Sequence, residues 1–559
     1  MAILEIKNLT FGYKSSDTKA LNDVSFEIEK GDFAVICGES GCGKTTLLRL
    51  LKKQLAPFGD KSGSALYKGT EIAEMDERTS VSAIGFVMQD PNSQIVTDKV
   101  WHELAFGLES LGENTSSIRR KVAEISEFFG ITEWYNRKTS DLSGGQKQIL
   151  NLASIMVMQP EILLLDEPTS QLDPIAASEF ISTLKKLNNE LGITVILAEH
   201  RLEEVFPIAN KVIVMDNGKI LNAGTPREVG KALKSSDSRM YLGMPSAIKI
   251  YNMLNSSAEC PLTVRECKDF IKNNYNEDIK ELQLPKTDYT GREAAFEIKD
   301  GYFRYEKNLP DVLKGLNLTV YKKEFLCILG GNGAGKTTLL KILSGIKRLY
   351  SGKLRIWGKK LKEYNNNTLY RNNIASLPQN PKLLFVKNNV YDDLTETANA
   401  FGYDKKDTAE AVENIASKLE IKHLYKRHPY DLSGGEVQKA AFAKILLAKP
   451  KIILLDEPTK GLDAYSKTVL ADMLKKLINE DITVVTVTHD IEFAAEYADR
   501  CALLFDGQIV SCGTPEEFFS ENNFYTTAAA RISKNIFINA VTNEEVANLC
   551  RQNGVKNAK

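Results

Sequence analysis

The stretch GESGCGKTT, residues 38–46, returns almost unchanged as GGNGAGKTT, residues 330–338. Each copy follows a short apolar run and precedes a run with helical periodicity, so each predicts a glycine-rich loop between a strand and a helix. Glycines let the backbone bend until successive N–H groups point at phosphate oxygens, and the helix N-terminus adds a favourable field. The spacing G-x-x-x-x-G-K-[ST] therefore predicts two phosphate-binding loops on one chain.

Each loop carries one lysine, placed to neutralise phosphate, and a threonine hydroxyl suited to Mg²⁺. The candidate residues of the first loop are Gly38, Glu39, Ser40, Gly41, Cys42, Gly43, Lys44, Thr45 and Thr46. Those of the second loop are Gly330, Gly331, Asn332, Gly333, Ala334, Gly335, Lys336, Thr337 and Thr338. In these sets Thr45 and Thr337 are the predicted Mg²⁺ ligands.

Other motifs repeat at the same offset of about 290 residues. ILLLDEPT (162–169) returns as IILLDEPT (452–459), and DLSGGQ (141–146) returns as DLSGGE (431–436). A period this long indicates two tandem domains and excludes a solenoid, whose repeats are about 20–50 residues long. The expected divisions are a first domain at 2–230, a tail and linker at 231–294, a second domain at 295–515 and a C-terminal tail at 516–559.

Within each copy, short β-branched apolar runs alternate with helical patterns. DFAVICG and ITVILAEH read as strands, and SEFISTLKKLNNELG reads as a helix. This alternation predicts an α/β domain with a mainly parallel sheet covered on both faces. After each copy, shorter helical-looking segments share a pattern of small residues and then Thr and Glu before an apolar turn, which predicts that the tails are repeated too.

An Asp-Glu pair ends one apolar strand of each copy. Asp166 and Asp456 are predicted to lie beside Mg²⁺, whose charge keeps a carboxylate ionised. Glu167 and Glu457 come next and are candidate bases that accept a proton from an attacking water. The pair occurs twice at the same distance from a phosphate loop, which argues against an ordinary acidic strand end.

Two of the five histidines also stand at equivalent strand ends. His200 follows ITVILAE and His489 follows ITVVTVT, where ligands collect at the carboxyl edge of a parallel sheet. A single histidine is more often structural than catalytic. The repeated position favours a sensor of the terminal phosphate that also orients the attacking water.

The composition is that of a globular protein. The 559 residues carry 72 basic and 73 acidic side chains and a net charge of −1, without the basic excess usual for nucleic-acid binding. We expect no signal peptide, because the N-terminus has no basic region followed by an apolar stretch, and no membrane span, because no apolar run reaches 18 residues. The eight scattered cysteines indicate reduced thiols in the cytosol.

The pentapeptides LSGGQ and LSGGE resemble the signature of ATP-binding-cassette ATPases, and the resemblance covers nearly all of both copies. It implies an enzyme that binds and hydrolyses ATP with Mg²⁺, in which two cassettes pair head to tail. Each ATP would then lie between one phosphate loop and the opposite signature, so that Lys44 shares an ATP with Ser433 and Lys336 with Ser143. The signature residues are Ser143, Gly144, Gly145, Gln146, Ser433, Gly434, Gly435 and Glu436.

Four further positions match the family. Tyr13 and Tyr305 each precede their loop's first glycine by 25 residues and would stack on adenine, although ordinary strand aromatics are a real alternative. Gln89 and Gln379 match a glutamine that touches Mg²⁺ and senses the transporter. Glu436 departs from the usual glutamine of the signature. It removes no catalytic group, so we expect two competent sites.

After Gln89 the sequence DPNSQIVTDKVWHELAFGLESLG resembles the ATPases of energy-coupling-factor importers, which take up vitamins and transition-metal ions. The resemblance implies peripheral attachment to the cytoplasmic face of the membrane, and integral partners that comprise a coupling component and a substrate-binding component. The second copy lacks the Ala-Phe-Gly-Leu-Glu run. A generic cassette with a generic surface helix is the alternative.

Other tandem cassettes stay open as alternatives. A factor acting on ribosomes would tend to carry basic arms, a charged helical insert or an iron–sulfur cysteine cluster, none of which is evident here. In sugar-importer ATPases the second site commonly has altered catalytic motifs, whereas here they are kept. A DNA-repair cassette would need a long coiled coil, for which there is no room.

Overall fold

The computed structural model describes residues 2–14, 18–233, 239–282, 291–523 and 525–556. It divides into two compact units. Unit 1 comprises Met1–Asn252 and Ser256–Thr263, and unit 2 comprises Met253–Asn255 and Val264–Lys559. Two parts of the predicted tail and linker, residues 234–238 and 283–290, lie outside the described residues.

The centre of unit 1 is a six-stranded sheet in the order β10-β9-β3-β8-β7-β6. All its neighbouring strands run parallel except β10, which pairs antiparallel with β9. The apolar runs of the central strands are buried throughout, as expected for parallel strands covered on both faces. The strands are β3 (Phe33–Gly38), β6 (Ile84–Val87), β7 (Ile162–Asp166), β8 (Thr194–Ala198), β9 (Lys211–Asp216) and β10 (Lys219–Gly224).

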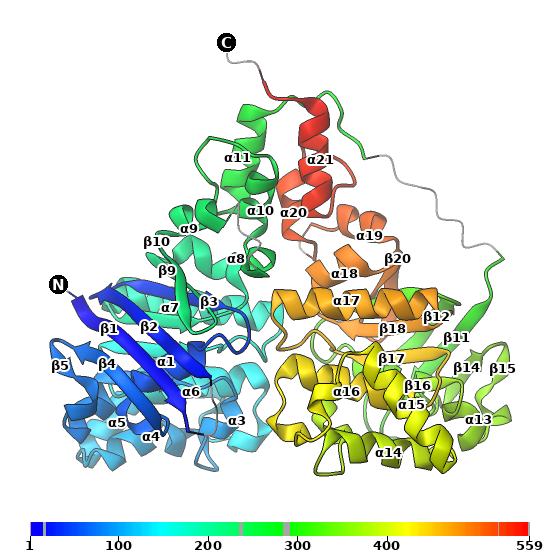
Figure 1. Ribbon diagram of the computed structural model, residues 1–559, viewed down its shortest axis with the longest axis horizontal. Coiled ribbons are helices and arrows are strands. Elements are labelled where there is room, and N and C mark those ends of the chain that lie inside the picture. The colour runs from blue at the N-terminus through cyan, green and yellow to red at the C-terminus, as the bar shows by residue number, and fades with distance from the viewer. Residues whose placement is uncertain (1, 15–17, 234–238, 283–290, 524, 557–559) are drawn as a thin grey trace. The chain divides into compact units, whose positions relative to one another are not determined.

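A second, antiparallel sheet of unit 1 has the order β2-β1-β4-β5 (Figure 1). Its alternating residues, such as Leu4 and Ile6, share one apolar core with Ile36 of β3 and Leu47 of α1. The helix that follows the phosphate loop is therefore packed in a core that both sheets share. The strands are β1 (Ala2–Tyr13), β2 (Lys19–Glu29), β4 (Gly59–Tyr67) and β5 (Thr70–Glu71).

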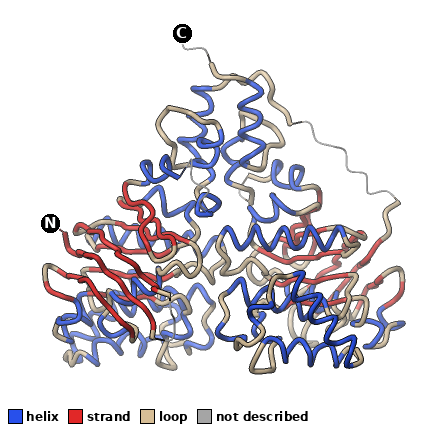
Figure 2. Tube along the Cα trace, in the orientation of Figure 1, coloured by secondary structure: helices blue, strands red, loops and turns tan. Residues whose placement is uncertain are grey.

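Helices and loops form the rest of the described part of unit 1 (Figure 2). A separate apolar cluster joins α4, α5 and α6, with Leu104, Val122 and Leu150 among its buried members. The helices are α1 (Lys44–Leu50), α2 (Glu77–Ala83), α3 (Pro91–Gln94), α4 (Val100–Ser110), α5 (Thr115–Phe128), α6 (Gly144–Met156), α7 (Pro174–Leu191), α8 (Leu202–Val205), α9 (Pro226–Ala232) and α10 (Ser246–Met253).

Unit 2 repeats this plan, with sheets in the orders β12-β11-β14-β15 and β16-β17-β18-β13-β19-β20. The predicted α/β fold and its duplication are confirmed. The strands are β11 (Ala294–Phe303), β12 (Leu313–Tyr321), β13 (Phe325–Leu329), β14 (Ser351–Ile356), β15 (Lys359–Lys360), β16 (Ile374–Leu377), β17 (Ile452–Asp456), β18 (Thr483–Thr488), β19 (Arg500–Phe505) and β20 (Gln508–Gly513). The helices are α11 (Val264–Asn274), α12 (Lys336–Leu343), α13 (Asn366–Tyr370), α14 (Val390–Ala400), α15 (Lys405–Lys418), α16 (Gly434–Leu446), α17 (Ala464–Asn479), α18 (Ile491–Tyr497), α19 (Pro515–Glu521), α20 (Ala528–Ser533) and α21 (Asn543–Asn553).

Helix α11 follows the first cassette in the chain but belongs to unit 2, where it packs against α20. Backbone and side-chain bonds extend this contact into α21. The side chain of Asn553 accepts a hydrogen bond from the N–H of Ile279 (2.6 Å) and donates one to the carbonyl of Ile279 (2.9 Å). Arg551 donates to the carbonyl of Met253 (2.7 Å). The segment after the first cassette is therefore a structural component of the C-terminal tail.

We expect Phe270→Ala to loosen that tail. Phe270 of α11 is 7% exposed, and truncating a buried phenylalanine costs about 3 kcal/mol. Hydrogen exchange of the α20 and α21 amides should accelerate, while exchange in β3 and β7 of unit 1 stays the same. Ile279→Ala, at a residue 44% exposed in the same segment, is the control. Unchanged exchange in α20 would contradict the packing described.

Candidate active site

The first phosphate loop owes its shape to two glycines with a left-handed backbone. Gly41 has φ of 84° and Gly43 has φ of 105°. Gly43 precedes α1, and a Cβ added there would lie 2.5 Å from the carbonyl oxygen of Ala20. In unit 2 Gly333 (φ 80°) and Gly335 (φ 101°) repeat the pattern. Only glycine adopts this conformation cheaply, which is the physical reason for the motif.

The loop lysines are buried and held by the loop itself. Lys44 is 4% exposed, and its ammonium donates to the carbonyls of Gly38 (2.9 Å) and Glu39 (3.0 Å). Its Nζ also lies 3.7 Å from Oε1 of Glu167. Lys336 is 8% exposed and bonds the carbonyls of Gly330 and Gly331. A buried ammonium requires such partners. The predicted phosphate lysines are thus fixed beside the loop.

A hydroxyl and a carboxylate meet where Mg²⁺ was predicted. Thr45 donates to Oδ1 of Asp166 (2.9 Å), and Thr337 donates to Oδ1 of Asp456 (3.2 Å). Within the described part of the chain no group of three or more His, Cys, Asp or Glu could hold a metal by itself. Mg²⁺ commonly takes one or two carboxylates and completes its shell with water and substrate phosphates. One hydroxyl and one carboxylate per site therefore fit Mg²⁺ bound together with a nucleotide.

Burial acts on these aspartates directly. Asp166 is 4% exposed, and burial, followed by the charge of Glu167, raises its pKa to about 6. Burial likewise raises the pKa of Asp456. A nearby cation would lower both pKa values, because it stabilises the ionised carboxyl.

Each candidate base follows its aspartate in a strained conformation. Glu167 has φ of 45° and Glu457 has φ of 49°, a left-handed region that costs a non-glycine residue on the order of 1–2 kcal/mol. Both conformations are held by a backbone bond to the neighbouring strand, from Glu167 N to Ala198 O (3.0 Å) and from Glu457 N to Val487 O (2.9 Å). Strain that recurs at equivalent residues of two copies points to function.

The carboxylate of Glu167 is surrounded by donors. Nε2 of His200 lies 2.7 Å from its Oε1, and the Gln89 amide donates to its Oε2 (2.8 Å). Burial alone raises the pKa of Glu167, but His200 and Lys44 outweigh burial, and the net pKa is lowered. The structure therefore brings the predicted base, histidine and glutamine together. Gln89 contacts Glu167 here, and not the Asp166–Thr45 pair.

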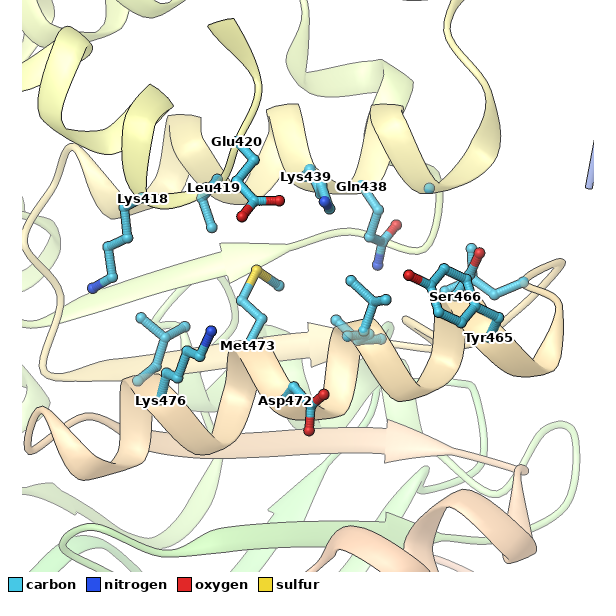
Figure 3. A pocket seen from close by; sticks show the side chains of 15 residues that line it. Lys418, Leu419, Glu420, Gln438, Lys439, Tyr465, Ser466, Asp472, Met473 and Lys476 are labelled. Atoms are coloured by element: carbon cyan, nitrogen blue, oxygen red, sulfur yellow. The ribbon is translucent and has the colours of Figure 1, made fainter. Parts of the chain in front are cut away.

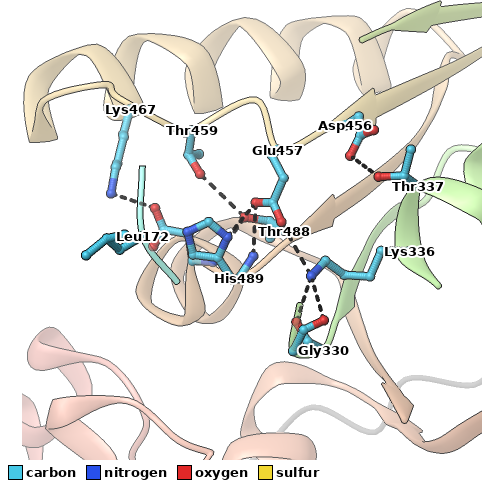
Figure 4. A network of polar contacts seen from close by, with 12 residues as sticks. Leu172, Gly330, Lys336, Thr337, Asp456, Glu457, Thr459, Lys467, Thr488 and His489 are labelled. Carbon is cyan, nitrogen blue, oxygen red and sulfur yellow. Dashed lines mark hydrogen bonds and ion pairs between the residues drawn. The ribbon is translucent and has the colours of Figure 1, made fainter. Parts of the chain in front are cut away.

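Unit 2 repeats the cluster with two differences, in the histidine nitrogen that meets the glutamate and in the contact of the glutamine (Figure 4). Nδ1 of His489 lies 2.9 Å from Oε2 of Glu457, and Nζ of Lys336 lies 3.5 Å from Oε1. His489 and Lys336 outweigh burial, so the pKa of Glu457 is also lowered. Gln379 is exposed, and among the described residues it makes no hydrogen bond to Glu457.

The two tyrosines reach the helices that follow the loops. The hydroxyls of Tyr13 and Thr46 lie 3.0 Å apart, as do those of Tyr305 and Thr338. Each phenol is thereby fixed to the first turn of α1 or α12. Stacking on adenine stays a prediction.

The signature residues begin helices α6 and α16. Ser143 caps α6 and accepts from the N–H of Gln146 (3.2 Å), whose side chain accepts from the N–H of Ser143 (3.0 Å). In unit 2 the carboxylate of Glu436 accepts hydrogen bonds from both the N–H and the hydroxyl of Ser433 (2.8 Å each). Arg427 donates to the same carboxylate (3.1 Å). Glu436 therefore competes for the hydroxyl that the signature would offer to a phosphate.

The motifs in the sequence do not predict a role for one buried acid of this region, Glu199. Glu199, 1% exposed, accepts from the hydroxyl of Thr169 (2.6 Å) and from the N–H of His200 (2.8 Å). Unit 2 has Thr488 there, 3.4 Å from Thr459. The only sequence signal was the contrast between AEH and VTH at the two strand ends.

We expect Asp166→Asn to stabilise unit 1 when neither Mg²⁺ nor nucleotide is present. Between about pH 4 and pH 6 the folded chain keeps a proton that the unfolded chain releases, so the free energy of unfolding falls as pH rises. Above pH 6 the penalty is complete, on the order of 3 kcal/mol. In thermal unfolding with EDTA at pH 7.5, the melting temperature of the variant should be higher than that of the wild type. The difference should close near pH 4, and a difference independent of pH would contradict this account.

Comparison with known proteins identifies the chain. The ABC transporter family model matches residues 21–170 and 313–460. A Bacillus cereus protein, provisionally named an ABC transporter ATP-binding protein, is 40% identical over 98% of this chain and 98% of its own. A Clostridium tetani protein of the same provisional name is 35% identical over 78% of this chain and 95% of its own. A Methanosarcina mazei protein of the same provisional name is 32% identical over 93% of this chain and 90% of its own.

Among solved structures, cbiO1 from Clostridium perfringens, part of the ABC transporter complex cbiONQ, is 31% identical over 42% of this chain and 94% of its own, with a TM-score of 0.38. No helix within the described ranges is both long and apolar enough to cross a bilayer. The chain belongs to the ABC transporter family and is an ATPase with two ATP-binding cassettes in tandem.

Proposed function

We propose that this ATPase energises a membrane importer of the energy-coupling-factor type, which takes up a vitamin or a transition-metal ion. It would act at the cytoplasmic face of the membrane, on an integral coupling component that carries a separate substrate-binding component. The observation that supports this most is an exposed apolar patch beside the active-site glutamine segment of each unit.

The patch of unit 1 is formed by Val96, Trp101 and Phe106, which are 68%, 37% and 41% exposed. Its loop is held in place by the buried carboxylate of Glu103, which accepts from the N–H groups of Val96 (3.1 Å) and Thr97 (2.7 Å). An apolar surface on a fixed loop is suited to contact with a partner.

The patch of unit 2 shares two positions with that of unit 1, because Val386 corresponds to Val96 and Tyr391 to Trp101, whereas Leu383 corresponds to Ser93. Leu383, Val386 and Tyr391 are 70%, 73% and 39% exposed. The fully buried carboxylate of Asp393 accepts from the N–H of Val386 (2.8 Å), as Glu103 does in unit 1. An apolar patch kept in both copies, each on a loop pinned by a buried acid, supports two docking surfaces for membrane components.

The importer class rests on the first copy. Gln94, the second glutamine of Gln-x-Pro-x-x-Gln, accepts from the N–H of Met88 (2.8 Å) and donates to the carbonyl of Phe86 (3.1 Å). It thus holds the backbone that carries Gln89. The Ala-Phe-Gly-Leu-Glu run lies in α4 and contributes Phe106 to the patch. The residues on which the resemblance to these importers rests therefore lie both beside the active site, at Gln94, and in the patch, at Phe106.

For hydrolysis we propose that Glu167 and Glu457 each accept a proton from the attacking water, with His200 and His489 orienting it. Each lowered pKa keeps the carboxylate ionised at neutral pH. Intramolecular pairing would raise the effective concentration of one cassette for the other. Ser433 would then complete the site of Lys44, and Ser143 that of Lys336.

Glu167→Gln and Glu457→Gln, made singly, should each retain ATP binding and cut hydrolysis by roughly 10²–10⁴-fold at the altered site, because the amide accepts no proton. Single-turnover hydrolysis and equilibrium nucleotide binding measure the two effects separately. Glu190→Gln, on the exposed end of α7, is the control for loss of one charge. Unaltered single-turnover hydrolysis at both sites in Glu457→Gln would show that Glu457 is not the base.

Val96→Asp and Val386→Asp should each weaken recovery of small integral membrane proteins with the tagged chain roughly tenfold, because the partner would have to bury a charge. Basal ATP hydrolysis by the purified variants should match the wild type. Phe58→Asp and Phe505→Asp alter side chains that are 80% and 66% exposed elsewhere and serve as controls. Recovery of ribosomal proteins in place of membrane proteins would overturn the importer proposal.

A further inference from the structure

The two units differ where α5 of unit 1 and α15 of unit 2 end. In unit 1 the last residue of α5 is Phe128, whose ring meets Phe129 edge-on at 5.1 Å between centroids. Nζ of Lys186, on α7, lies 4.7 Å from the centroid of Phe128. The chain thereby places its own aromatic ring under a lysine at this position.

In unit 2 the equivalent ring is missing. The last residue of α15 is Lys418, which forms an ion pair with Glu480 at the end of α17. A second ring, the fully buried Phe180 of unit 1, is replaced by the smaller Leu470. Both changes remove apolar volume from the same position between α5 and α7, or between α15 and α17.

A pocket of about 300 Å³ opens at this place in unit 2 (Figure 3). Its apolar lining includes Leu419, Leu462, Val469 and Met473. This volume is at the low end of the range found for ligand pockets. The pocket therefore suits one large side chain better than a whole cofactor. The apolar part of this lining lacks contacts when nothing fills it, while Glu420, Gln438 and Asp472 make the rest of the lining polar.

The lysine that covers the ring in unit 1 has a counterpart here. Lys476 of α17 stands at the position of Lys186, and Lys439 of α16 also lines the pocket. Among the described residues neither ammonium has an ion-pair or hydrogen-bond partner. A cation over the face of an aromatic ring attracts it by about 0.5–2 kcal/mol.

We propose that this pocket binds an aromatic side chain of a partner polypeptide, seated as Phe128 is seated in unit 1. Phe128 itself is 36% exposed, so the bound ring would be partly covered, with a cation over its face and apolar atoms beneath it. Gly435 of the signature and Leu462, five residues after Glu457, both line the pocket. The pocket that a bound ring would enter therefore extends to two segments that adjoin the catalytic machinery. This inference does not depend on the identity of the membrane partner.

The test uses the full chain and a peptide copying residues 122–131, VAEISEFFGI, with a second peptide in which both phenylalanines are leucine. Ligand-observed NMR should show saturable binding of the first peptide and roughly tenfold weaker binding of the second. Lys418→Phe rebuilds the arrangement of unit 1, and it should abolish binding, raise the melting temperature of unit 2 and leave ATP hydrolysis unchanged. Lys476→Met keeps the apolar stem, and it should weaken binding about threefold.

A converse variant tests the proposal independently, in case Lys418→Phe does not fold. Phe128→Ala should create a second site in unit 1 for the aromatic peptide. Peptide binding that survives in a folded Lys418→Phe variant, or that fails to distinguish the two peptides, would overturn the proposal. So would binding of N-acetyl-phenylalaninamide without binding of the peptide, because the site would then belong to a free aromatic metabolite.

Discussion

The arrangement of each active site depends on one buried ammonium group. Lys44 and Lys336 are almost fully enclosed, and a buried cation is tolerated only where oxygens surround it. The carbonyls that meet this need come from the loop itself, at Gly38 and Gly330 among others. The loop can turn back in this way because two glycines just before each lysine take up left-handed backbone angles. In each unit the charge of this one lysine therefore holds the end of the strand, the phosphate loop and the start of the helix in place relative to one another.

That charge also separates the roles of two adjacent carboxyl groups. Asp166 and Glu167 are neighbours in the chain and are both buried, yet burial raises the pKa of Asp166 while His200 and Lys44 lower that of Glu167. Environments that push two pKa values apart assign different chemistry to similar groups. Here the glutamate is suited to accept a proton, and the aspartate, which gains most from a nearby cation, is suited to hold a metal. The left-handed backbone of Glu167 points the two side chains in different directions.

Much of this could be read from the sequence because the decisive signals are local. Spacing within GKTT and LLLDEPT fixes the loop, the lysine and the acidic pair, and the repeat fixes the duplication. Contacts between segments far apart in the chain could not be read in this way. The packing of α11 on α20 joins residues about 260 positions apart, and Glu199 gains its role only when β8 brings it beside Thr169. A local pattern says nothing of such partners, since their pairing is set by the tertiary fold.

Duplication within one chain makes the differences between the copies informative. Both copies keep the ammonium, the strained glutamate and the histidine, so each copy has the groups that the proposed chemistry needs. The copies differ at residues around these groups. Glu199 of the first copy corresponds to Thr488 of the second, Gln146 to Glu436, and Phe128 to Lys418. None of these changes removes a group that holds phosphate or accepts a proton. They alter what positions the histidine, what competes for the signature serine and what fills the space beside the signature helix. Two cassettes of equal chemistry can thereby respond differently to their surroundings, which separate identical subunits of a symmetric dimer cannot do.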